Sequence, residues 1–312
     1  MSLLSFVIPC YGSENTINAV IDEIISVVSQ KQEYDYEIIA VNDQSPDNVI
    51  NVLKLIAAKN KKVKVIDLAK NFGKHSAVMA GFSQVKGEYI ICLDDDGQCP
   101  MDRLWDLLEP VEKGEADYSM ADYAVKKQSK FKNLGSAANS LMSYILLNKP
   151  KDMHFTNFKA MKRFIVDEIV KYNNPYPYLE GLTLRTTNKI AMVPMEERDR
   201  IAGVGHFTFK KSISLWVNGF TAFSVKPLRI STIIGLICSI IGFIYGLVVV
   251  VRRLCNPAIM LGYSSIMAAM LFIGGVIMVM LGMIGEYIGR IYISLNNSPQ
   301  YVIRDIINKD DD

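Results

Sequence analysis

The sequence has few of the residues that form disulfide bonds or metal sites of nitrogen and sulfur. Its five cysteines show no Cys-x-x-Cys spacing, and its three histidines show no metal-ligand spacing. This usage indicates free, buried thiols in a reducing compartment. Residues 1–10 contain neither a basic start nor a cleavage site, so we expect no secretory signal peptide there.

Two nucleotide-binding signatures are also missing. No Gly-x-Gly-x-x-Gly follows the first expected strand, and no Gly-x-x-x-x-Gly-Lys-Ser/Thr occurs in the chain. These absences argue against a hydride-transfer enzyme and against a P-loop ATPase. The formal net charge is only +2 in 312 residues, which says little about nucleic acid. No nucleic-acid partner is predicted.

Long apolar runs are present, and they gather near one end of the chain. Residues 230–251 contain no charged side chain over about 22 residues, enough to cross a ~30 Å hydrocarbon core at ~1.5 Å per residue. Residues 254–285 are again uncharged, and the short turn 252–257 joins the two runs. We therefore expect a two-helix transmembrane hairpin, over about 230–251 and 259–285. The alternative is a pair of core helices.

The surroundings of these runs suggest contacts with lipid and with other helices. Residues 212–229 mix three aromatic side chains with two basic ones, and Lys211 directly precedes them. This mixture is typical of an amphipathic segment at a membrane surface; the alternative for the apolar residues is ordinary core. Gly242-x-x-x-Gly246 and Gly285-x-x-x-Gly289 allow close helix approach, either within the hairpin or between copies in a homo-oligomer.

Strand and helix patterns alternate in the first hundred residues. Short apolar runs predict strands at 5–8, 37–41, 63–66 and 89–93. Apolar residues at helical spacing predict helices between them. This alternation predicts an α/β domain whose mostly parallel sheet is covered on both faces.

Three carboxylates and a glutamine follow the fourth strand. Side chains alternate along an extended chain, so Asp94, Asp96 and Gln98 can share one side while Asp95 points elsewhere. Carboxylate oxygens suit Mg²⁺ or Mn²⁺, and the carboxyl edge of such a sheet is where ligands bind. The turn therefore predicts a metal site that also holds a diphosphate. The alternative is an acidic turn that caps a helix.

These motifs resemble a known family. The chain is similar to the inverting family-two glycosyltransferases with the GT-A fold, and among them to the polyprenyl-phosphate glycosyltransferases such as dolichol-phosphate mannose synthase and the bacterial undecaprenyl-phosphate glucosyltransferases. The motifs that carry the resemblance are Val7–Tyr11, Val41–Asp47, Asn71–Lys74, Leu93–Gln98, Arg200–Thr208, Ser224–Arg229 and Gly285–Tyr292.

The resemblance implies a site for the donor, a nucleotide-diphosphate sugar that is a UDP-hexose by family frequency. The residues implied in nucleotide-sugar binding are Pro9, Tyr11, Asn42, Asp43, Lys74, Asp94 and Asp95. The residues implied in metal binding are Asp94, Asp96 and Gln98. Asn42 departs from the family, which usually has aspartate there.

The resemblance also implies a site for the acceptor, a polyprenyl phosphate such as undecaprenyl phosphate. Arg200, His206 and Lys126 are the candidates for contact with its phosphate. His206 stands where the family usually has lysine, which makes that contact dependent on pH. Lys126 opens a cluster of four lysines that is either a solvated loop or a landing site for anionic lipid.

The expected catalytic residues are Asp96, Asp152, Asn157 and Arg200. Relatives often have an aspartate, the proposed base, where this chain has Asn157, which cannot accept a proton. Either another carboxylate serves, with Asp152 and Asp96 as candidates, or no base is needed. A phosphate monoester with a second pKa near ~6 is mostly dianionic at neutral pH, so it needs positioning more than deprotonation.

The expected organisation is a cytoplasmic GT-A domain at 1–211, an amphipathic segment at 212–229, the hairpin within 230–286 and a cytoplasmic tail at 287–312. The protein is then a multi-pass protein of the cytoplasmic membrane, where it transfers a hexose to a lipid phosphate for cell-envelope glycans.

Two other functions stay open. One is a non-catalytic nucleotide-sugar sensor or scaffold. The other is a processive polysaccharide synthase, which would need more spans and a Gln-x-x-Arg-Trp motif that the sequence lacks.

Overall fold

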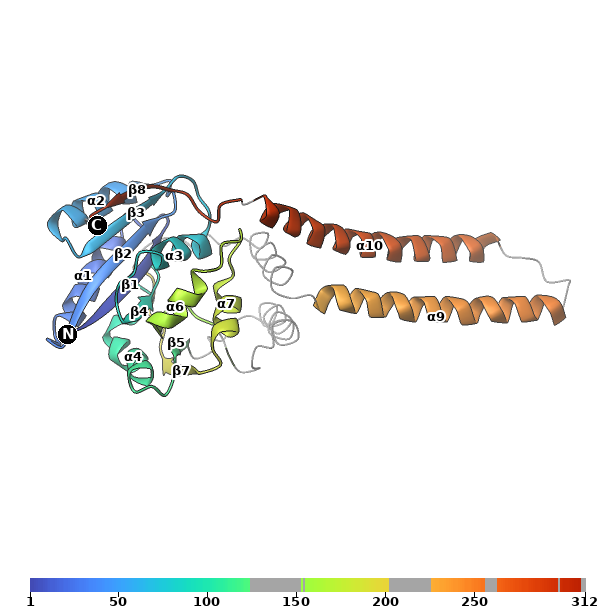
Figure 1. Cartoon of the computed structure of the whole chain (residues 1–312), viewed down its shortest axis with the longest axis horizontal. Helices are drawn as coiled ribbons and strands as arrows, with labels where there is room; N and C mark the ends of the chain where they lie inside the picture. Colours follow the sequence, from blue (N-terminus) through green and yellow to red (C-terminus); the bar gives the residue numbers. More distant parts are fainter. Residues whose placement is uncertain (124–152, 154, 202–225, 256–262, 297, 310–312) are drawn as a thin grey trace. The chain divides into compact units, whose positions relative to one another are not determined.

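The computed structural model describes residues 1–123, 153, 155–201, 226–255, 263–296 and 298–309 (Figure 1). The chain divides into two compact units. Met1–Gly219 and Asn297–Asp312 form the first unit, and Phe220–Asn296 forms the second.

Four parallel strands form the centre of the sheet in the first unit. They are β1 (Ser2–Cys10), β2 (Tyr34–Asn42), β3 (Val63–Leu68) and β4 (Tyr89–Cys92). The strand order of the eight-stranded sheet is β7-β5-β6-β4-β1-β2-β3-β8. The chain therefore runs from β1 to β3 in one direction and returns to the other side of β1 with β4. Ligands bind at such a switch point, beyond the carboxyl ends of the strands.

Helices cover both faces of these strands. They are α1 (Ile17–Val28), α2 (Val49–Lys59), α3 (Lys74–Phe82) and α4 (Leu104–Glu112), the last after a short 3₁₀ turn at Met101–Arg103. Leu4, Phe6 and Ile8 of β1 belong to the core shared with α1, α2 and α4. Each is fully buried, which contributes about 1.5–3 kcal/mol per side chain.

Helix α3 packs on the opposite face through a glycine. A Cβ atom at Gly81 would lie 2.4 Å from Cγ1 of Val7 and 3.2 Å from Cγ2 of Val41. Only glycine lets the helix approach the sheet this closely, and the approach brings the first turn of α3 toward the carboxyl edge of the strands.

The remaining strands make the sheet mixed at its edges. They are β5 (Tyr118–Tyr123), β6 (Lys159–Lys162), β7 (Ile190–Met195) and β8 (Ile303–Ile307), and helices α6 (Arg163–Ile169) and α7 (Leu179–Thr186) lie between β6 and β7 in the chain. β6 pairs antiparallel with β4, and β8 pairs antiparallel with β3. The α/β class and the mostly parallel sheet are confirmed. No strand was predicted in the tail, where β8 lies beside β3 (Figure 1).

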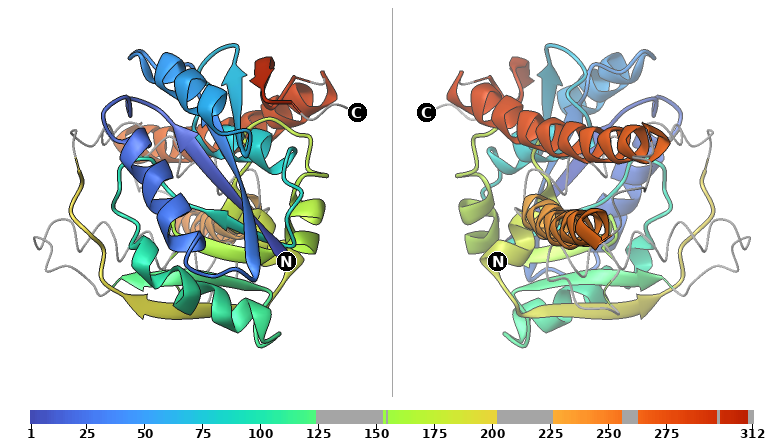
Figure 2. Two further views of the ribbon diagram at one scale, coloured as in Figure 1. Left: turned by 90° about the vertical axis from the view of Figure 1, so that its left-hand side faces the viewer. Right: turned by 90° about the vertical axis from the view of Figure 1, so that its right-hand side faces the viewer.

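The second unit contains two long helices, α9 (Lys226–Cys255) and α10 (Tyr263–Leu295), which lie side by side (Figures 1 and 2). Within the described residues, one segment, Phe272–Leu295, is long and apolar enough to cross a membrane, with a mean hydropathy of 1.8. A second apolar segment, Gly235–Val248, is shorter. The two-helix transmembrane hairpin therefore stays a prediction.

The contact between the two helices does not use the glycines that the sequence suggested. A Cβ atom at Gly235 would lie 2.2 Å from Cε of Met280, so α10 crosses α9 at Gly235. At Gly242, Gly246, Gly285 and Gly289, an added Cβ would meet no described atom within 4 Å outside its own helix. In the described part of the hairpin these four glycines make no close contact between the two helices. A role in contacts between copies of the chain stays a prediction.

Candidate active site

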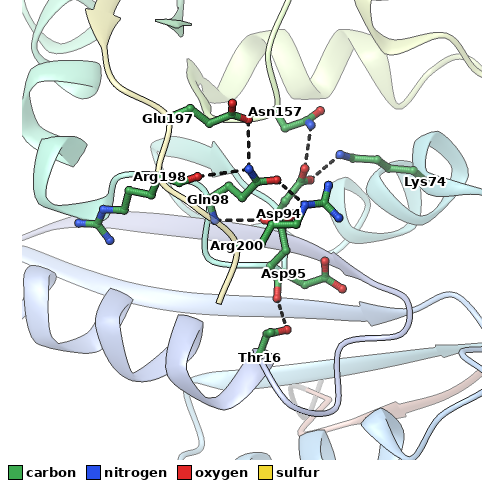
Figure 3. A network of polar contacts seen from close by, with 10 residues as sticks. Thr16, Lys74, Asp94, Asp95, Gln98, Asn157, Glu197, Arg198 and Arg200 are labelled. Atoms are coloured by element: carbon green, nitrogen blue, oxygen red, sulfur yellow. Dashed lines mark hydrogen bonds and ion pairs between the residues drawn. The ribbon is translucent and has the colours of Figure 1, made fainter. Parts of the chain in front are cut away.

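The acidic turn lies directly after β4, beside the end of β1, and its carboxylates separate toward different partners (Figure 3). Oδ1 of Asp94 forms an ion pair with Nζ of Lys74, the first residue of α3. Oδ2 of Asp94 accepts a hydrogen bond of 2.7 Å from Nδ2 of Asn157. Asp94 is thus held between a cation and an amide donor that lie far apart in the sequence.

Asp96 and Gln98 share one cation. Nε of Arg200 donates to Oε1 of Gln98 at 2.7 Å and lies 3.3 Å from Oδ2 of Asp96. Oδ1 of Asp96 accepts from the backbone N–H of Gln98 at 3.1 Å. Each of these two carboxylates of the acidic turn therefore has a cation beside it, Lys74 at Asp94 and Arg200 at Asp96.

Asp95 points away from this region, as the alternation predicted. Its Oδ2 accepts from the backbone N–H of Tyr11 at 2.9 Å, and its backbone carbonyl accepts from the Thr16 hydroxyl at 2.6 Å. Burial raises the pKa of Asp95 to about 6, and the Tyr11 N–H offsets only part of that shift. Asp95 therefore holds the loop after β1 against the acidic turn, and its direct contact with a nucleotide sugar stays a prediction.

Gly97 is required by the shape of the turn. Its φ is +78°, and a Cβ atom there would lie 2.3 Å from Cδ1 of Ile201. A larger residue would be strained at this φ and would also push Ile201 out of place. Ile201 directly follows Arg200, so the glycine also supports the position of that arginine.

The segment after β7 is bound to the acidic turn along its backbone. The N–H of Arg198 donates to the carbonyl of Gln98 at 3.1 Å, and the N–H of Ile201 donates to the carbonyl of Asp96 at 3.2 Å. The Arg198 guanidinium forms ion pairs with Glu23, at 2.7 Å, and with Asp102. The segment thus presents Arg200 to the site from about a hundred residues away in the sequence.

The residues expected at the nucleoside lie along the same edge of the sheet. Pro9 belongs to β1 and Tyr11 follows it, while Asn42 ends β2 and Asp43 follows that strand. Asp43 accepts backbone N–H bonds from Phe72, at 2.7 Å, and Gly73, at 2.8 Å. Burial raises the pKa of Asp43 above its usual value. The Asp43 carboxylate therefore fixes the loop that leads into Lys74.

The structure brings most of the predicted site residues to one edge of the sheet. They are Pro9, Tyr11, Asn42, Asp43, Lys74, Asp94, Asp95, Asp96, Gln98, Asn157 and Arg200. Three other candidates, Lys126, Asp152 and His206, lie outside the described residues.

A buried polar cluster next to Lys74 was not predicted. Nδ1 of His75 and Oε2 of Glu180 lie 3.9 Å apart, and neither atom has a hydrogen-bond partner among the described residues. Burial lowers the pKa of His75. Burial alone would raise the pKa of Glu180, but His75 and Lys159 outweigh it and lower that pKa. In the sequence, this cluster is visible only as single polar residues that stand among apolar ones.

The donor set of the acidic turn fits a divalent cation that is shared with a substrate. Hard cations such as Mg²⁺ are often held by one or two carboxylates together with phosphate oxygens, rather than by a complete protein cage. Asp94, Asp96 and Gln98 supply such a partial set. In the part of the chain that the structure describes, no group of three or more His, Cys, Asp or Glu side chains is placed to hold a metal.

Comparison with known proteins gives the family. Residues 5–170 match the glycosyl transferase family 2, and residues 226–291 match the GtrB C-terminal hairpin. The chain is 32% identical to the uncharacterized glycosyltransferase YkcC of Bacillus subtilis over 304 residues, which are 96% of this chain and 93% of that protein. It is 30% identical to a bactoprenol glucosyl transferase of Shigella phage SfV over 307 residues, which are 96% of this chain and 98% of that protein. The chain therefore belongs to glycosyl transferase family 2, and the predicted resemblance is confirmed.

Solved structures share the fold. Mannosyl-3-phosphoglycerate synthase from Rubrobacter xylanophilus is 20% identical, with a TM-score of 0.52 over 73% of this chain and 74% of that one. Glucosyl-3-phosphoglycerate synthase from Mycobacterium tuberculosis, solved with Mn²⁺ and UDP-glucose, is 18% identical. Its TM-score is 0.52 over 70% of this chain and 77% of that one. These likenesses confirm the GT-A architecture.

Proposed function

We propose that the protein transfers a hexose from a UDP-sugar to a polyprenyl phosphate, with inversion at the anomeric carbon, at the cytoplasmic face of a membrane. One observation carries this proposal. Asp94 pairs with Lys74, while Asp96 and Gln98 meet Arg200, so the acidic turn carries two cations that come from distant segments of the chain. Two phosphate-bearing substrates that meet at one carbon need such a pair of cations.

The relatives support both substrates. The matching bactoprenol glucosyl transferases act, by name, on a polyprenol, and they cover nearly the whole chain. The glucosyl-3-phosphoglycerate synthase with the same fold binds UDP-glucose and Mn²⁺. The hairpin match at 226–291 supports a membrane anchor for an enzyme whose acceptor carries a lipid tail.

On the donor side, the diphosphate lies in our proposal at the acidic turn. Asp94, Asp96 and Gln98 would hold Mg²⁺ or Mn²⁺, and the bound cation supplies positive charge to the departing diphosphate. Lys74 adds a second positive charge from the start of α3, where the N-terminus of the helix also favours anions. Asn42 and Asp43 bind the nucleoside further along the edge.

On the acceptor side, Arg200 binds the lipid phosphate. It presents one phosphate oxygen to the anomeric carbon, on the side opposite the departing diphosphate. Guanidinium groups suit this task because their planar fork matches phosphate oxygens. Asn157 donates to Asp94 and cannot act as a base. A dianionic phosphate needs none, whereas an alcohol acceptor would.

The test is a transfer assay on purified full-length protein held in nanodiscs. Labelled nucleotide sugars are supplied with Mg²⁺ or Mn²⁺ and undecaprenyl phosphate, and label entering the lipid phase is measured. We expect one donor to be used, and we expect Asp96→Ala to abolish transfer. Asp106→Ala removes an exposed carboxylate on α4 and should transfer at the normal rate.

A second function is favoured by one residue. Asn157 stands where relatives often have the aspartate that is the proposed base. A nucleotide-sugar sensor without turnover would also lack a base at this position. Binding of a nucleotide sugar with no transfer to any lipid phosphate would overturn the catalytic proposal and support the sensor.

A further inference from the structure

A chain of polar contacts joins the tail of the protein to the nucleoside edge of the sheet. Nδ2 of Asn42 donates to Oδ1 of Asp67 at 2.7 Å. The other oxygen of Asp67, Oδ2, lies 3.2 Å from Nη1 of Arg304 on β8. Nη2 of Arg304 also donates to the carbonyl of Ala69 at 2.9 Å, so the guanidinium spans the end of β3. One carboxylate thus connects Arg304 to Asn42.

The two inner residues of this series of polar contacts, Asn42 and Asp67, are complementary to each other. Asn42 and Asp67 lie directly opposite in the pairing of β2 with β3, and both are almost fully buried, with exposed fractions of 4% and 7%. An aspartate at position 42, as is usual in the family, would put two carboxylates within hydrogen-bond distance. Asparagine donates instead, so its amide and the Asp67 carboxylate are complementary.

The contact also fixes the orientation of the Asn42 amide. Because Nδ2 faces Asp67, Oδ1 faces the other way and accepts the N–H of Ser45 at 3.1 Å. Ser45 in turn lies in the loop that begins with Asp43, and its hydroxyl accepts the N–H of Gly12 at 2.7 Å. The orientation of one amide therefore holds the loops after β1 and β2 together.

Arg304 supplies the positive charge for Asp67. A buried carboxylate is costly unless it is paired and hydrogen-bonded, and removing one partner leaves the charge uncompensated. Asp67 would then rotate toward water. This movement would release the Asn42 amide, because its acceptor would no longer lie opposite it.

We propose that Arg304 is a positioning residue of the donor-nucleoside site, acting through Asp67 on Asn42. The inference rests on the proposed function, in which Asn42 and Asp43 bind the nucleoside of the donor. It adds that this site is completed by β8, a strand that follows α10 in the chain. The nucleoside site therefore depends on both the beginning and the end of the sequence.

The strand β8 offers a matched control at its other end. Nδ2 of Asn308 donates to the carbonyl of Ala57 at 2.7 Å and to that of Val63 at 2.9 Å. These bonds hold β8 against the sheet without contact with Asn42 or Asp67. Asn308→Ala therefore weakens the docking of the strand and leaves the polar chain intact.

The experiment measures UDP and GDP affinity by calorimetry, with Mg²⁺, on the full chain in nanodiscs. Arg304→Met keeps the length of the side chain and removes its charge, and we expect a Kd for the preferred nucleotide about tenfold higher. Arg304→Lys keeps the charge and should recover part of the affinity. Asn308→Ala should bind as the unmodified protein does. In transfer assays Arg304→Met should raise KM for the donor and leave kcat unchanged.

A double-mutant cycle tests the path. If Arg304 acts through Asn42, adding Arg304→Met to Asn42→Ala causes no further loss of affinity. Equal losses from Arg304→Met and Asn308→Ala would overturn the inference, because both would then act through docking of β8. Unchanged affinity in Arg304→Met would overturn it as well. If the unmodified chain binds neither nucleotide, the proposed function itself fails.

Discussion

Asn157→Asp is the substitution that best tests the chemistry of the site. Nδ2 of Asn157 donates to Oδ2 of Asp94 at 2.7 Å, and the other oxygen of Asp94 is paired with Lys74. Aspartate is the same size as asparagine but replaces the donor by a carboxylate. The substitution therefore turns an attraction into a repulsion at one contact and leaves the rest of the turn unchanged.

The cost follows from the geometry. Two unit charges ~4 Å apart repel by about 4 kcal/mol at an effective dielectric constant of ~20 and by about 1 kcal/mol in bulk water, so a partly exposed pair lies between these limits, at about 2 kcal/mol. Because Asn157 is exposed, the new carboxylate can also turn into solvent, and the cost is then the lost hydrogen bond to a charged group, about 1.5–3 kcal/mol. Both routes give about 2 kcal/mol, which lowers Tm by about 4–8 °C in a domain of this size.

The assay is thermal unfolding of the full chain in EDTA and in Mn²⁺. In EDTA we expect Asn157→Asp to melt below the unmodified protein. Mn²⁺ should raise its Tm by more than it raises that of Asn157→Ala, because only the aspartate variant adds a further carboxylate beside Asp94 whose repulsion the cation can offset. An unchanged Tm in EDTA, or an equal gain from Mn²⁺ in both variants, would refute the assignment of this contact.

Transfer assays on the same variant test whether a base is needed. If the acceptor is a dianionic phosphate, Asn157→Asp should transfer no faster than the unmodified protein, and the rate of both should rise with pH through ~6 and then level off. A tenfold gain in kcat for the aspartate variant would refute attack without a base.

Three further predictions concern other parts of the site. Chelation of divalent cations should abolish transfer, and Mg²⁺ or Mn²⁺ should restore it. Arg198→Ala removes two ion pairs that hold the segment carrying Arg200, so KM for the lipid phosphate should rise severalfold while UDP affinity is kept. Burial lowers the pKa of His75 in the folded protein, so below pH ~6.5 this histidine binds a proton more readily in the unfolded chain. The free energy of unfolding should therefore fall as the pH decreases, by up to about 1.4 kcal/mol per pH unit. His75→Gln should flatten this part of the curve of Tm against pH.

Local patterns of the sequence determined the core of the fold. Apolar runs at strand spacing predicted β1 to β4, because burial on both faces demands continuous hydrophobic residues in a parallel strand. The same logic placed the acidic turn at the carboxyl edge, and alternation along the chain separated Asp95 from Asp94 and Asp96. Motif resemblance then gave the family, which the comparisons confirm.

The later strands were not visible in the same way. β6 spans only Lys159–Lys162, too short for a periodicity to appear. The strand β8 carries Arg304 and Asp305 in its centre and reads as a polar tail. It is a strand because the edge of β3 offers unpaired backbone groups, a fact that its own residues do not contain.

The sequence by itself thus determined the class of protein and the strands of the first half, and it supplied the candidates for most site residues. Only the tertiary structure decided which of them meet. Arg200 reaches Asp96 from a segment about a hundred residues away, and Arg304 reaches Asp67 from the end of the chain. The physical reason is that hydrophobic periodicity is a local property, whereas ion pairs and buried hydrogen bonds depend on how distant segments pack.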